Sequence, residues 1–297
     1  CPVAQANPKN VLMFYMCGDN EFSPGLTAAL DLMRAAGGSD NDVTIIAMID
    51  TIDGTTDNGI SYDDGIYYIT GSPSTDIKLW APPPQTPELV ISDPTELDFF
   101  INFVTTNYPA DRYILTIWDH GSGLHVLADH DHGSYPSPDI SIQDLGTHLA
   151  NSGVHFDLIQ FEACFMDMAE VGYELRNSAN VMVASEDNDF MSRPYNKIVK
   201  WLKDNPQASA HVLGIQIVDG YFDRNPPPHS GTLAVIDLTK MSTVATSMDN
   251  LGNVLNANMP TQQSAILAAA TATQRYHIVN FADIIDFTNQ LDSRIND

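Results

Sequence analysis

The sequence predicts an α/β protein with a mostly parallel central sheet that is covered by helices on both faces. Short runs of consecutive apolar residues are typical of strands buried on both faces. Segments with apolar residues three or four positions apart, typical of amphipathic helices, lie between these runs. Strands that alternate with helices over 297 residues indicate βαβ units, which build parallel sheets.

The strands are predicted from apolar runs that stop at polar or glycine-bearing loops. The run from Val11 to Met16 contains no polar side chain except a tyrosine hydroxyl and stops at Cys17-Gly18. A hairpin region is expected at 60–70, after an acidic, glycine-rich segment. Further buried strands are expected at residues 43–49, 113–118, 156–161, 181–184 and 231–238.

The helices are predicted from spacing and from their start and stop residues. Residues 25–36 have apolar side chains at helical spacing and stop at Gly37-Gly38. Asp93 or Pro94 begins a helix through Asn107, because proline suits the first helical position. Further helices are expected at about 141–151, at 167–178, in two pieces split near Pro206 across 194–223, and in the C-terminal part.

The chain shows no internal repeat and no clear linker, which favours one α/β domain with a helical C-terminal extension. We therefore divide it into an N-terminal tail at residues 1–10, a domain at 11–240, and an extension at 241–297 that packs on the same domain. An apolar content of 43% supplies enough side chains for a large core.

The charge balance limits the classes of partner. Thirteen Lys and Arg residues stand against 38 Asp and Glu residues, which gives a net charge of −25. Such a surface repels phosphate backbones and anionic lipid headgroups and attracts cations. We expect no nucleic-acid partner. No apolar run reaches the length of a transmembrane span, so we also expect no transmembrane span.

Three cysteines are too few for a disulfide scaffold. Cys1 leaves two alternatives open: it is simply where the sequence begins, or it is the lipid-modified first residue of a bacterial lipoprotein. Cys17 is interpreted as a small apolar residue that ends its strand. Cys164 follows a buried strand and raises a different possibility.

Polar segments follow four of the predicted strands. In open parallel sheets, ligand sites lie outside the carboxyl ends of the strands. That rule selects the segments Cys17–Asn20, Asp119–Gly123, Glu162–Cys164 and Ser185–Asp189.

Two of these segments carry the parts of a thiol nucleophile and its base. An imidazole at His120 can assist a thiolate at Cys164 and then protonate the leaving amine. Gly121 has no side chain, so its N–H can approach a carbonyl oxygen, and the Cys164 N–H is a second donor for an oxyanion hole. The alternative is that the cysteine is buried and unreactive and that the histidine takes no part in catalysis.

Several motifs, in the same order along the chain, resemble the clostripain family of cysteine peptidases, family C11, which belongs with the caspases, gingipains and legumains. The two main ones are Trp118–Gly123 and Phe156–Met168, the second containing FEACFMDM. Supporting matches are Phe14-Tyr15-Met16 with Asp19-Asn20, Asn107–Tyr113, Glu170–Arg176 and Val183–Glu186.

The resemblance implies a caspase-like three-layer αβα sandwich and a peptidase domain at 11–240. It also implies a catalytic dyad of His120 and Cys164, and cleavage of a peptide or protein substrate after Lys or Arg. Family members are typically secreted, periplasmic or surface proteins of bacteria. No cofactor takes part in the chemistry, although calcium activates some members, so calcium is a candidate ion here.

Specificity for a basic residue requires a carboxylate, since a buried cation is costly unless it is paired. Glu162 stands where the family usually has an aspartate, and we expect it to bind the cationic side chain. Other candidates are Asp19, Glu186, Asp187 and Asp189, and each also suits a solvated loop. After Ser185-Glu186 the chain departs from the family pattern, and Arg193 in this departure can compete for the same acids.

Other features carry less weight. We considered zinc at a group formed by His125, His130 and His132 with Asp129 and Asp131, but a loop does not fix ligand geometry. Five acids, Asp50, Asp53, Asp57, Asp63 and Asp64, suit calcium chemically, but their spacing is not that of an EF-hand and favours a solvated loop. Residues 121–163 contain neither Lys nor Arg, so we expect no self-cleavage there by a basic-specific enzyme.

The sequence therefore predicts a cysteine endopeptidase that cleaves after Lys or Arg. Two alternatives stay open. One keeps the dyad but prefers an uncharged residue before the scissile bond. The other is an inactive caspase-like protein that only binds peptides.

Overall fold

The computed structural model describes residues 10–52, 56–57, 60–84, 88–128, 139–189, 192–224, 231–277 and 280–295. Its main element is an eight-stranded sheet with the strand order β12-β11-β10-β7-β1-β2-β5-β6. The bounds are β1 Asn10–Gly18, β2 Val43–Thr51, β5 Gly65–Tyr68, β6 Ile77–Trp80, β7 Arg112–Trp118, β10 Phe156–Glu162, β11 Ala179–Ala184 and β12 Ala234–Asp237.

The five central strands, from β11 to β2, run parallel, which confirms the predicted mostly parallel sheet. The outer strands β5, β6 and β12 are antiparallel to their neighbours. Two small sheets lie in the loops: β3 Thr56–Asp57 with β4 Ile60–Ser61, and β8 His125–Val126 with β9 Ile140–Ser141.

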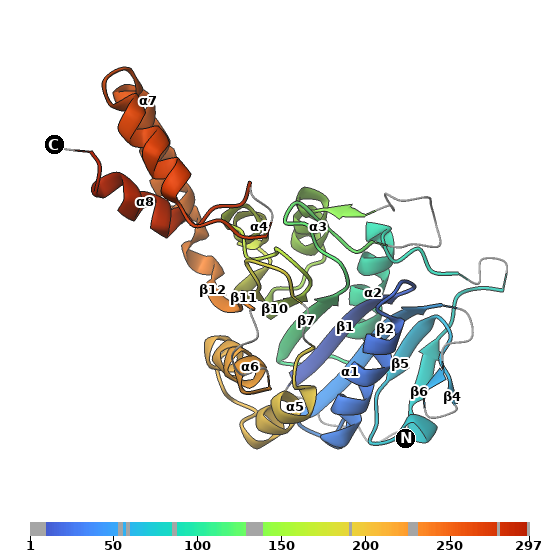
Figure 1. Cartoon of the computed structure of the whole chain (residues 1–297). Helices are drawn as coiled ribbons and strands as arrows, with labels where there is room; N and C mark the ends of the chain where they lie inside the picture. The colour runs from blue at the N-terminus through green and yellow to red at the C-terminus, as the bar shows by residue number, and fades with distance from the viewer. Residues whose placement is uncertain are drawn as a thin grey trace.

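Helices cover both faces of the sheet, as Figure 1 shows. Alternate residues of β1 belong to two separate cores, because successive side chains of a strand point to opposite faces. Leu12 and Phe14 pack with one set of helices, whereas Met13 and Tyr15 pack with the other. The first set is α1 Ser23–Ala35, α5 Tyr195–Asp204 and α6 Ala210–Arg224; the second is α2 Pro94–Asn107, α3 Ile142–Asn151 and α4 Ala169–Leu175.

Two short 3-10 helices, η1 Pro73–Thr75 and η2 Leu238–Lys240, and two C-terminal helices, α7 Met241–Ala272 and α8 Ile284–Asp292, complete the fold. The C-terminal helices project beyond the edge of the sheet that ends in β12 (Figure 1). Ile266 and Ala269 of α7 form a small core of their own with Leu291 of α8. Among the described residues, no helix has both the length and the apolar character that crossing a bilayer requires.

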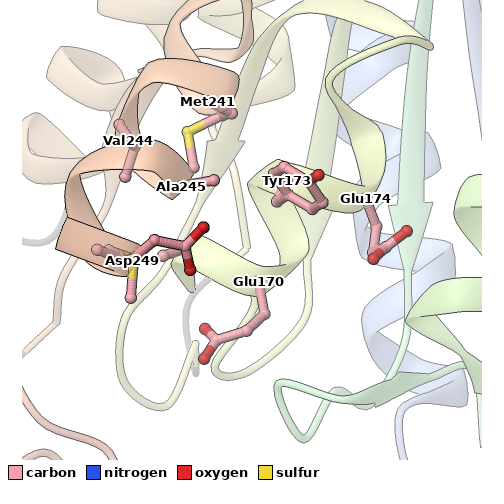
Figure 2. A pocket seen from close by; sticks show the side chains of 9 residues that line it. Glu170, Tyr173, Glu174, Met241, Val244, Ala245 and Asp249 are labelled. Carbon is pink, nitrogen blue, oxygen red and sulfur yellow. The ribbon is translucent and has the colours of Figure 1, made fainter. Parts of the chain in front are cut away.

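The extension contacts the domain through α7 and α4. Met241 of α7 lies 3.1 Å from the position that a Cβ on Gly172 of α4 would take. A cavity of about 250 Å³ lies between these helices, with Tyr173 on one side and Val244 on the other (Figure 2). Its lining contains no residue from the four predicted strand-end segments.

Most predicted elements are present, with two differences. The hairpin expected at 60–70 is absent as one element, because β4 pairs with β3 whereas β5 pairs with β2 and β6. The helix expected from residue 167 begins at Ala169, because Met168 before it has an extended backbone. Cys164 and Phe165 form a turn ahead of this helix. Phe165 in this turn has a φ of 63°, which a helix does not allow. Cys164 therefore lies on a turn that precedes the helix.

A buried ion pair fixes α1 to the segment between β5 and β6. The Arg34 Nε and Nη2 atoms donate to Asp76 Oδ2 at 2.9 and 2.8 Å, and the Tyr62 hydroxyl donates to the same oxygen at 2.7 Å. The side chains of Arg34 and Asp76 are 3% and 2% exposed.

We expect the Asp76→Ala variant to lose about 3–5 kcal/mol of unfolding free energy, because it removes the buried carboxylate and leaves the Arg34 guanidinium with the half-exposed Asp31, 3.0 Å away. Urea unfolding of the purified protein measures the loss. Asp204→Ala is the matched control, since Asp204 forms an exposed pair with Lys200 at 2.8 Å that contributes at most about 1 kcal/mol. Equal unfolding midpoints for the two variants would contradict the role of the Arg34–Asp76 pair.

Candidate active site

The register of β7 and β10 brings the two predicted catalytic segments to the same place. Trp118 and Glu162 are register partners at the ends of these parallel strands. The Asp119 N–H continues the ladder by donating to the Glu162 carbonyl at 3.2 Å. His120 and Cys164 each lie two residues beyond this pair. Because neighbouring strands are about 4.8 Å apart, the segments that carry imidazole and thiol emerge side by side.

Gly121 shows how closely the two segments meet. A Cβ at this position would lie 2.5 Å from the Cys164 carbonyl oxygen and 3.1 Å from the Ala163 Cβ. Any larger residue would therefore push the two segments apart. The predicted oxyanion donors, the amides of Gly121 and Cys164, belong to residues in direct contact, and their role stays a prediction.

The turn after β10 that carries Cys164 has a strained backbone at the following residue, Phe165. Phe165 has a positive φ, which is rare for a residue other than glycine. Backbone bonds to the segment after β11 stabilise it: the Phe165 N–H donates to the Asp187 carbonyl at 3.1 Å, and the Asp167 N–H donates to the Ser185 carbonyl at 2.9 Å. The turn is thus fastened to residues 185–187.

The Cys164 thiol is half-buried and faces the segment after β11. Its Sγ accepts a hydrogen bond from the Asp189 N–H at 3.2 Å. Burial raises the pKa of the thiol, the Asp189 and Asp187 carboxylates raise it further, and the Asp189 N–H partly opposes them. At neutral pH the thiol is therefore mostly protonated, and its attack on a carbonyl requires a base.

His120 is held by the segment that follows β1. Its ring lies against the Phe22 ring, with the centroids 4.2 Å apart, and its Nε2 lies 3.2 Å from Glu21 Oε1. The imidazole is one-third exposed, so it is accessible from solvent. Glu21 and Phe22 were not predicted as site residues, although they directly follow the strand-end segment Cys17–Asn20.

Asp119 and Asn20 connect this segment to the histidine. The Asn20 amide donates to Asp119 Oδ1 at 2.7 Å, and the Phe22 N–H donates to Asn20 Oδ1 at 2.8 Å. Asp119 is buried and also accepts a hydrogen bond from the Ala128 N–H at 2.5 Å. Burial raises the pKa of Asp119 well above its usual range. Asp119 thus connects loops, and its omission from the dyad stays a prediction.

Two of the predicted substrate-binding acids converge on one arginine. Glu162 is 7% exposed, and its Oε1 accepts a hydrogen bond from the Arg193 N–H at 3.1 Å. Its Oε2 accepts another from the Tyr195 hydroxyl. The Arg193 guanidinium binds both oxygens of Asp189, at 2.9 and 2.6 Å, and both side chains are 0% exposed. Burial raises the pKa of Glu162, although Arg193 and Tyr195 lower it in part.

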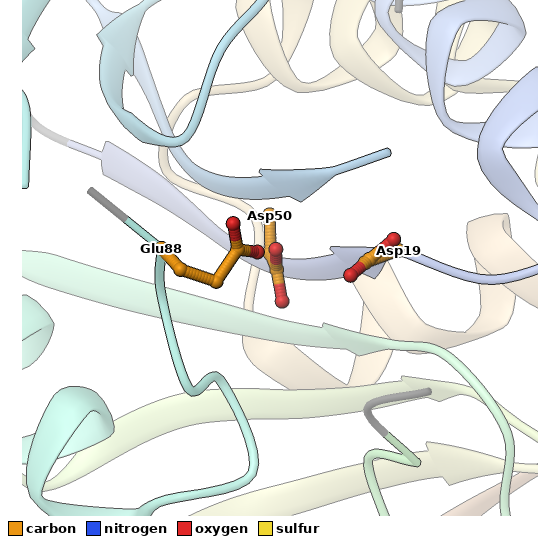
Figure 3. A group of neighbouring side chains, drawn as sticks. All are labelled: Asp19, Asp50 and Glu88. Atoms are coloured by element: carbon orange, nitrogen blue, oxygen red, sulfur yellow. The ribbon is translucent and has the colours of Figure 1, made fainter. Parts of the chain in front are cut away.

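The other predicted acids lie elsewhere. Glu186 is half-buried beside Asp167, whose pKa is raised to about 7 by burial and by the Glu186 charge. Asp19 follows β1, which is separated from β10 by β7. It lies with Asp50 and Glu88, in a group whose carboxylate oxygens all come within 4.8 Å of one another (Figure 3). Asp19 is thus grouped with acids other than Glu162.

The described acids of the segment considered for calcium, Asp50, Asp63 and Asp64, do not form one group. Asp64 accepts hydrogen bonds from the Thr51 and Leu89 amides at 3.0 and 2.9 Å, and Asp63 pairs with Lys78 at 3.7 Å. Asp53 and the Asp57 side chain lie outside the described part of the chain. Among the described side chains of this segment, that of Asp50 joins a cluster, and the oxygen ligands of that cluster suit a hard cation. Calcium stays a prediction.

The histidine-rich segment gives no metal group among the described residues. His125 Nδ1 lies 3.7 Å from Asp139 Oδ2. The other predicted ligands, at positions 129–132, lie outside the described residues, as does Cys1.

A segment of the C-terminal extension borders the site, which we did not predict. Phe281 packs edge-on against Phe165, with centroids 5.7 Å apart, and lies 3.0 Å from the position that a Cβ on Gly123 would take. The His277 N–H donates to Asp187 Oδ1 at 3.3 Å. Residues more than 100 positions after Cys164 thus pack beside its turn, and no local sequence pattern indicates such a contact.

Comparison with solved structures identifies the class of fold. A zymogen C11 protease from Parabacteroides distasonis, described as inactive, matches 98% of this chain and 81% of its own, with a TM-score of 0.70 and 20% identity. The secreted C11 cysteine protease iotapain from Bacteroides thetaiotaomicron matches 96% of this chain and 80% of its own, with a TM-score of 0.67 and 17% identity. The fold is the caspase-like α/β fold of these proteins.

The chain belongs to the clostripain family, because the family model matches residues 14–296. Clostripain from Hathewaya histolytica is 26% identical over 322 aligned positions, which cover 91% of this chain and 61% of clostripain. The chain thus spans about 61% of the length of this relative. The resemblance noted from the motifs is confirmed at the level of the family.

We expect Gly121→Ala to reduce kcat by about 10²–10³-fold, because the added methyl displaces one of the two amides expected to stabilise the oxyanion. Steady-state kinetics with a cleaved reporter peptide measures the change. Gly252→Ala is the control, since a Cβ at that position in α7 meets nothing within 4 Å. Full activity of Gly121→Ala would remove this amide from the mechanism.

The raised pKa of Cys164 predicts how its alkylation depends on pH. A raised pKa leaves less thiolate at neutral pH, so the rate with iodoacetamide should increase about tenfold per pH unit from 7 to 8.5. Asp187→Asn removes a carboxylate that raises this pKa, so the rise should shift to lower pH. Mass spectrometry of the labelled protein gives both rates, with Asp204→Asn as control. A curve that Asp187→Asn leaves unchanged would rule out this electrostatic effect.

Proposed function

We propose that this protein is a cysteine endopeptidase in which Cys164 attacks a peptide carbonyl and His120 serves as base and acid. The single observation that carries the proposal is the contact of Gly121 with Cys164 at the ends of two register-paired strands, with His120 beside it. Membership of the clostripain family supports the same assignment.

The expected reaction follows from the chemistry of these groups. As the Cys164 Sγ–carbon bond forms, the thiol proton passes to the His120 imidazole and the carbonyl oxygen becomes an oxyanion that the Gly121 and Cys164 amides stabilise. The carbon–nitrogen bond then breaks, and the imidazolium protonates the leaving amine. Water, deprotonated by His120, hydrolyses the thioester and restores the thiol.

The residue before the scissile bond is the open question of specificity. A preference for Lys or Arg would require Glu162 and Asp189 to be open to the substrate. In the structure, both carboxylates are buried and bind Arg193 of the same chain. This observation favours the alternative, an uncharged residue before the scissile bond, and we adopt it here.

We propose an extracellular site of action in a bacterium, with peptides or proteins as the substrates. The similar structure of iotapain, a C11 protease described as secreted, supports this location. The net charge of −25 supports the absence of nucleic-acid partners. Attachment through a lipid on Cys1 is a proposal that mass spectrometry of the N-terminus in the native protein tests.

We expect Cys164→Ala to abolish hydrolysis of a mixed reporter-peptide library, because it removes the nucleophile. Cys17→Ala should keep most of the turnover, since Cys17 is fully buried at the end of β1. Peptide cleavage followed by mass spectrometry measures both, and circular dichroism checks folding. Cleavage that persists in Cys164→Ala would refute the dyad, and a library left intact by the wild type would favour the inactive peptide-binding alternative.

A further inference from the structure

We propose that Arg193 is the specificity-determining residue of this peptidase: its guanidinium occupies the anionic site that would otherwise bind a substrate Lys or Arg. The enzyme then accepts an uncharged side chain before the scissile bond. This inference rests on the proposed function, because it concerns the same nucleophile.

The two carboxylates of this site belong to residues next to the nucleophile. Glu162 precedes Cys164 by two residues at the end of β10. Asp189 donates its own N–H to Cys164 Sγ at 3.2 Å. A substrate whose carbonyl carbon meets this sulfur therefore carries the adjacent side chain toward the same region, where a basic side chain would seek these acids.

Arg193 makes the contacts that a substrate guanidinium would make. It binds both oxygens of Asp189 in the two-pronged geometry that carboxylates form with arginine. Its Nη2 also donates to the Phe161 carbonyl at 2.9 Å, and its Cζ lies 5.0 Å from the centroid of the Tyr221 ring. The charge is thus paired, hydrogen-bonded and placed over an aromatic face.

The backbone of Arg193 is held in place by neighbouring elements of the fold. Its N–H donates to Glu162, while Tyr195, two residues later, places its hydroxyl between Glu162 and the Gln160 amide, the latter at 3.0 Å. Tyr195 is the first residue of α5. Between them, Pro194 lies 3.0 Å from the position of a Cβ on Gly220 in α6. The backbone of Arg193 is therefore held by β10, α5 and α6 together.

The charge balance explains the expected selectivity. Asp189 is neutralised by Arg193, and burial favours the uncharged form of Glu162. A second cation brought to these two carboxylates would face the Arg193 charge. Transfer of an unpaired charge from water is strongly unfavourable. An apolar or amide side chain avoids this penalty.

The test compares reporter peptides that differ only in the residue before the scissile bond: Ala, Leu, Gln, Lys or Arg. We expect the wild type to have a kcat/KM at least about 100-fold higher for the best uncharged peptide than for Lys or Arg. In Arg193→Ala the vacated site should accept a cation, so the ratio should shift toward Lys and Arg by at least about tenfold. Arg224→Ala, at the exposed end of α6, should keep the wild-type profile.

The Arg193→Ala variant leaves Asp189 buried without its partner, so a second measurement guards against misfolding. Methylguanidinium should raise the melting temperature of Arg193→Ala in a concentration-dependent way and leave that of the wild type unchanged. The double variant Asp189→Asn with Arg193→Met removes both charges at similar volume, and should fold, keep the uncharged preference and ignore methylguanidinium.

The outcomes separate the inference from the proposed function. Cleavage that depends on Cys164 but prefers Lys or Arg in the wild type overturns the role of Arg193 and leaves the peptidase intact. A protein that cleaves no peptide refutes the peptidase, and methylguanidinium then still decides whether the site is a guanidinium site. No thermal response in Arg193→Ala overturns the inference.

Discussion

The pairing of β7 with β10 is the constraint on which the candidate site depends. Parallel strands in register bring equivalent positions of two loops to the same height, so the step from Trp118 to His120 and the step from Glu162 to Cys164 end side by side. A slip of one residue would send each side chain to the opposite face of the sheet. The apolar side chains of both strands, buried in the two cores, make such a slip costly and therefore fix the chemistry.

The surroundings of the Cys164 thiol determine its protonation state. Burial and two carboxylates keep the sulfur protonated, which protects it from indiscriminate reaction in water. The imidazole of His120 contacts Glu21 and Phe22, which follow β1. The thiol and the imidazole are therefore held by different segments, the thiol by the one after β11 and the imidazole by the one after β1.

Much of the fold was predictable, because apolar runs and helical spacing reflect burial directly. The parallel strands and the helices on both faces are examples, and Pro94 at the first helical position predicted the start of α2. The meeting of the two candidate loops was also predictable, since strand ends and motif order indicate which loops meet; the dyad itself stays a prediction. The exact start of α4 was not predictable, because it depends on the bond from the Asp167 N–H to the Ser185 carbonyl and on the extended backbone of Met168. The partner of Glu162 was only suggested, because a sequence shows a nearby Arg193 without showing that it is buried.

The contact of Phe281 with Phe165 brings the helical extension to the turn that carries Cys164. The Phe281 ring, from the segment between α7 and α8, borders the turn that carries the sulfur. A substitution at Phe281 would therefore reach the surroundings of Cys164 from outside the sheet, without changing any strand.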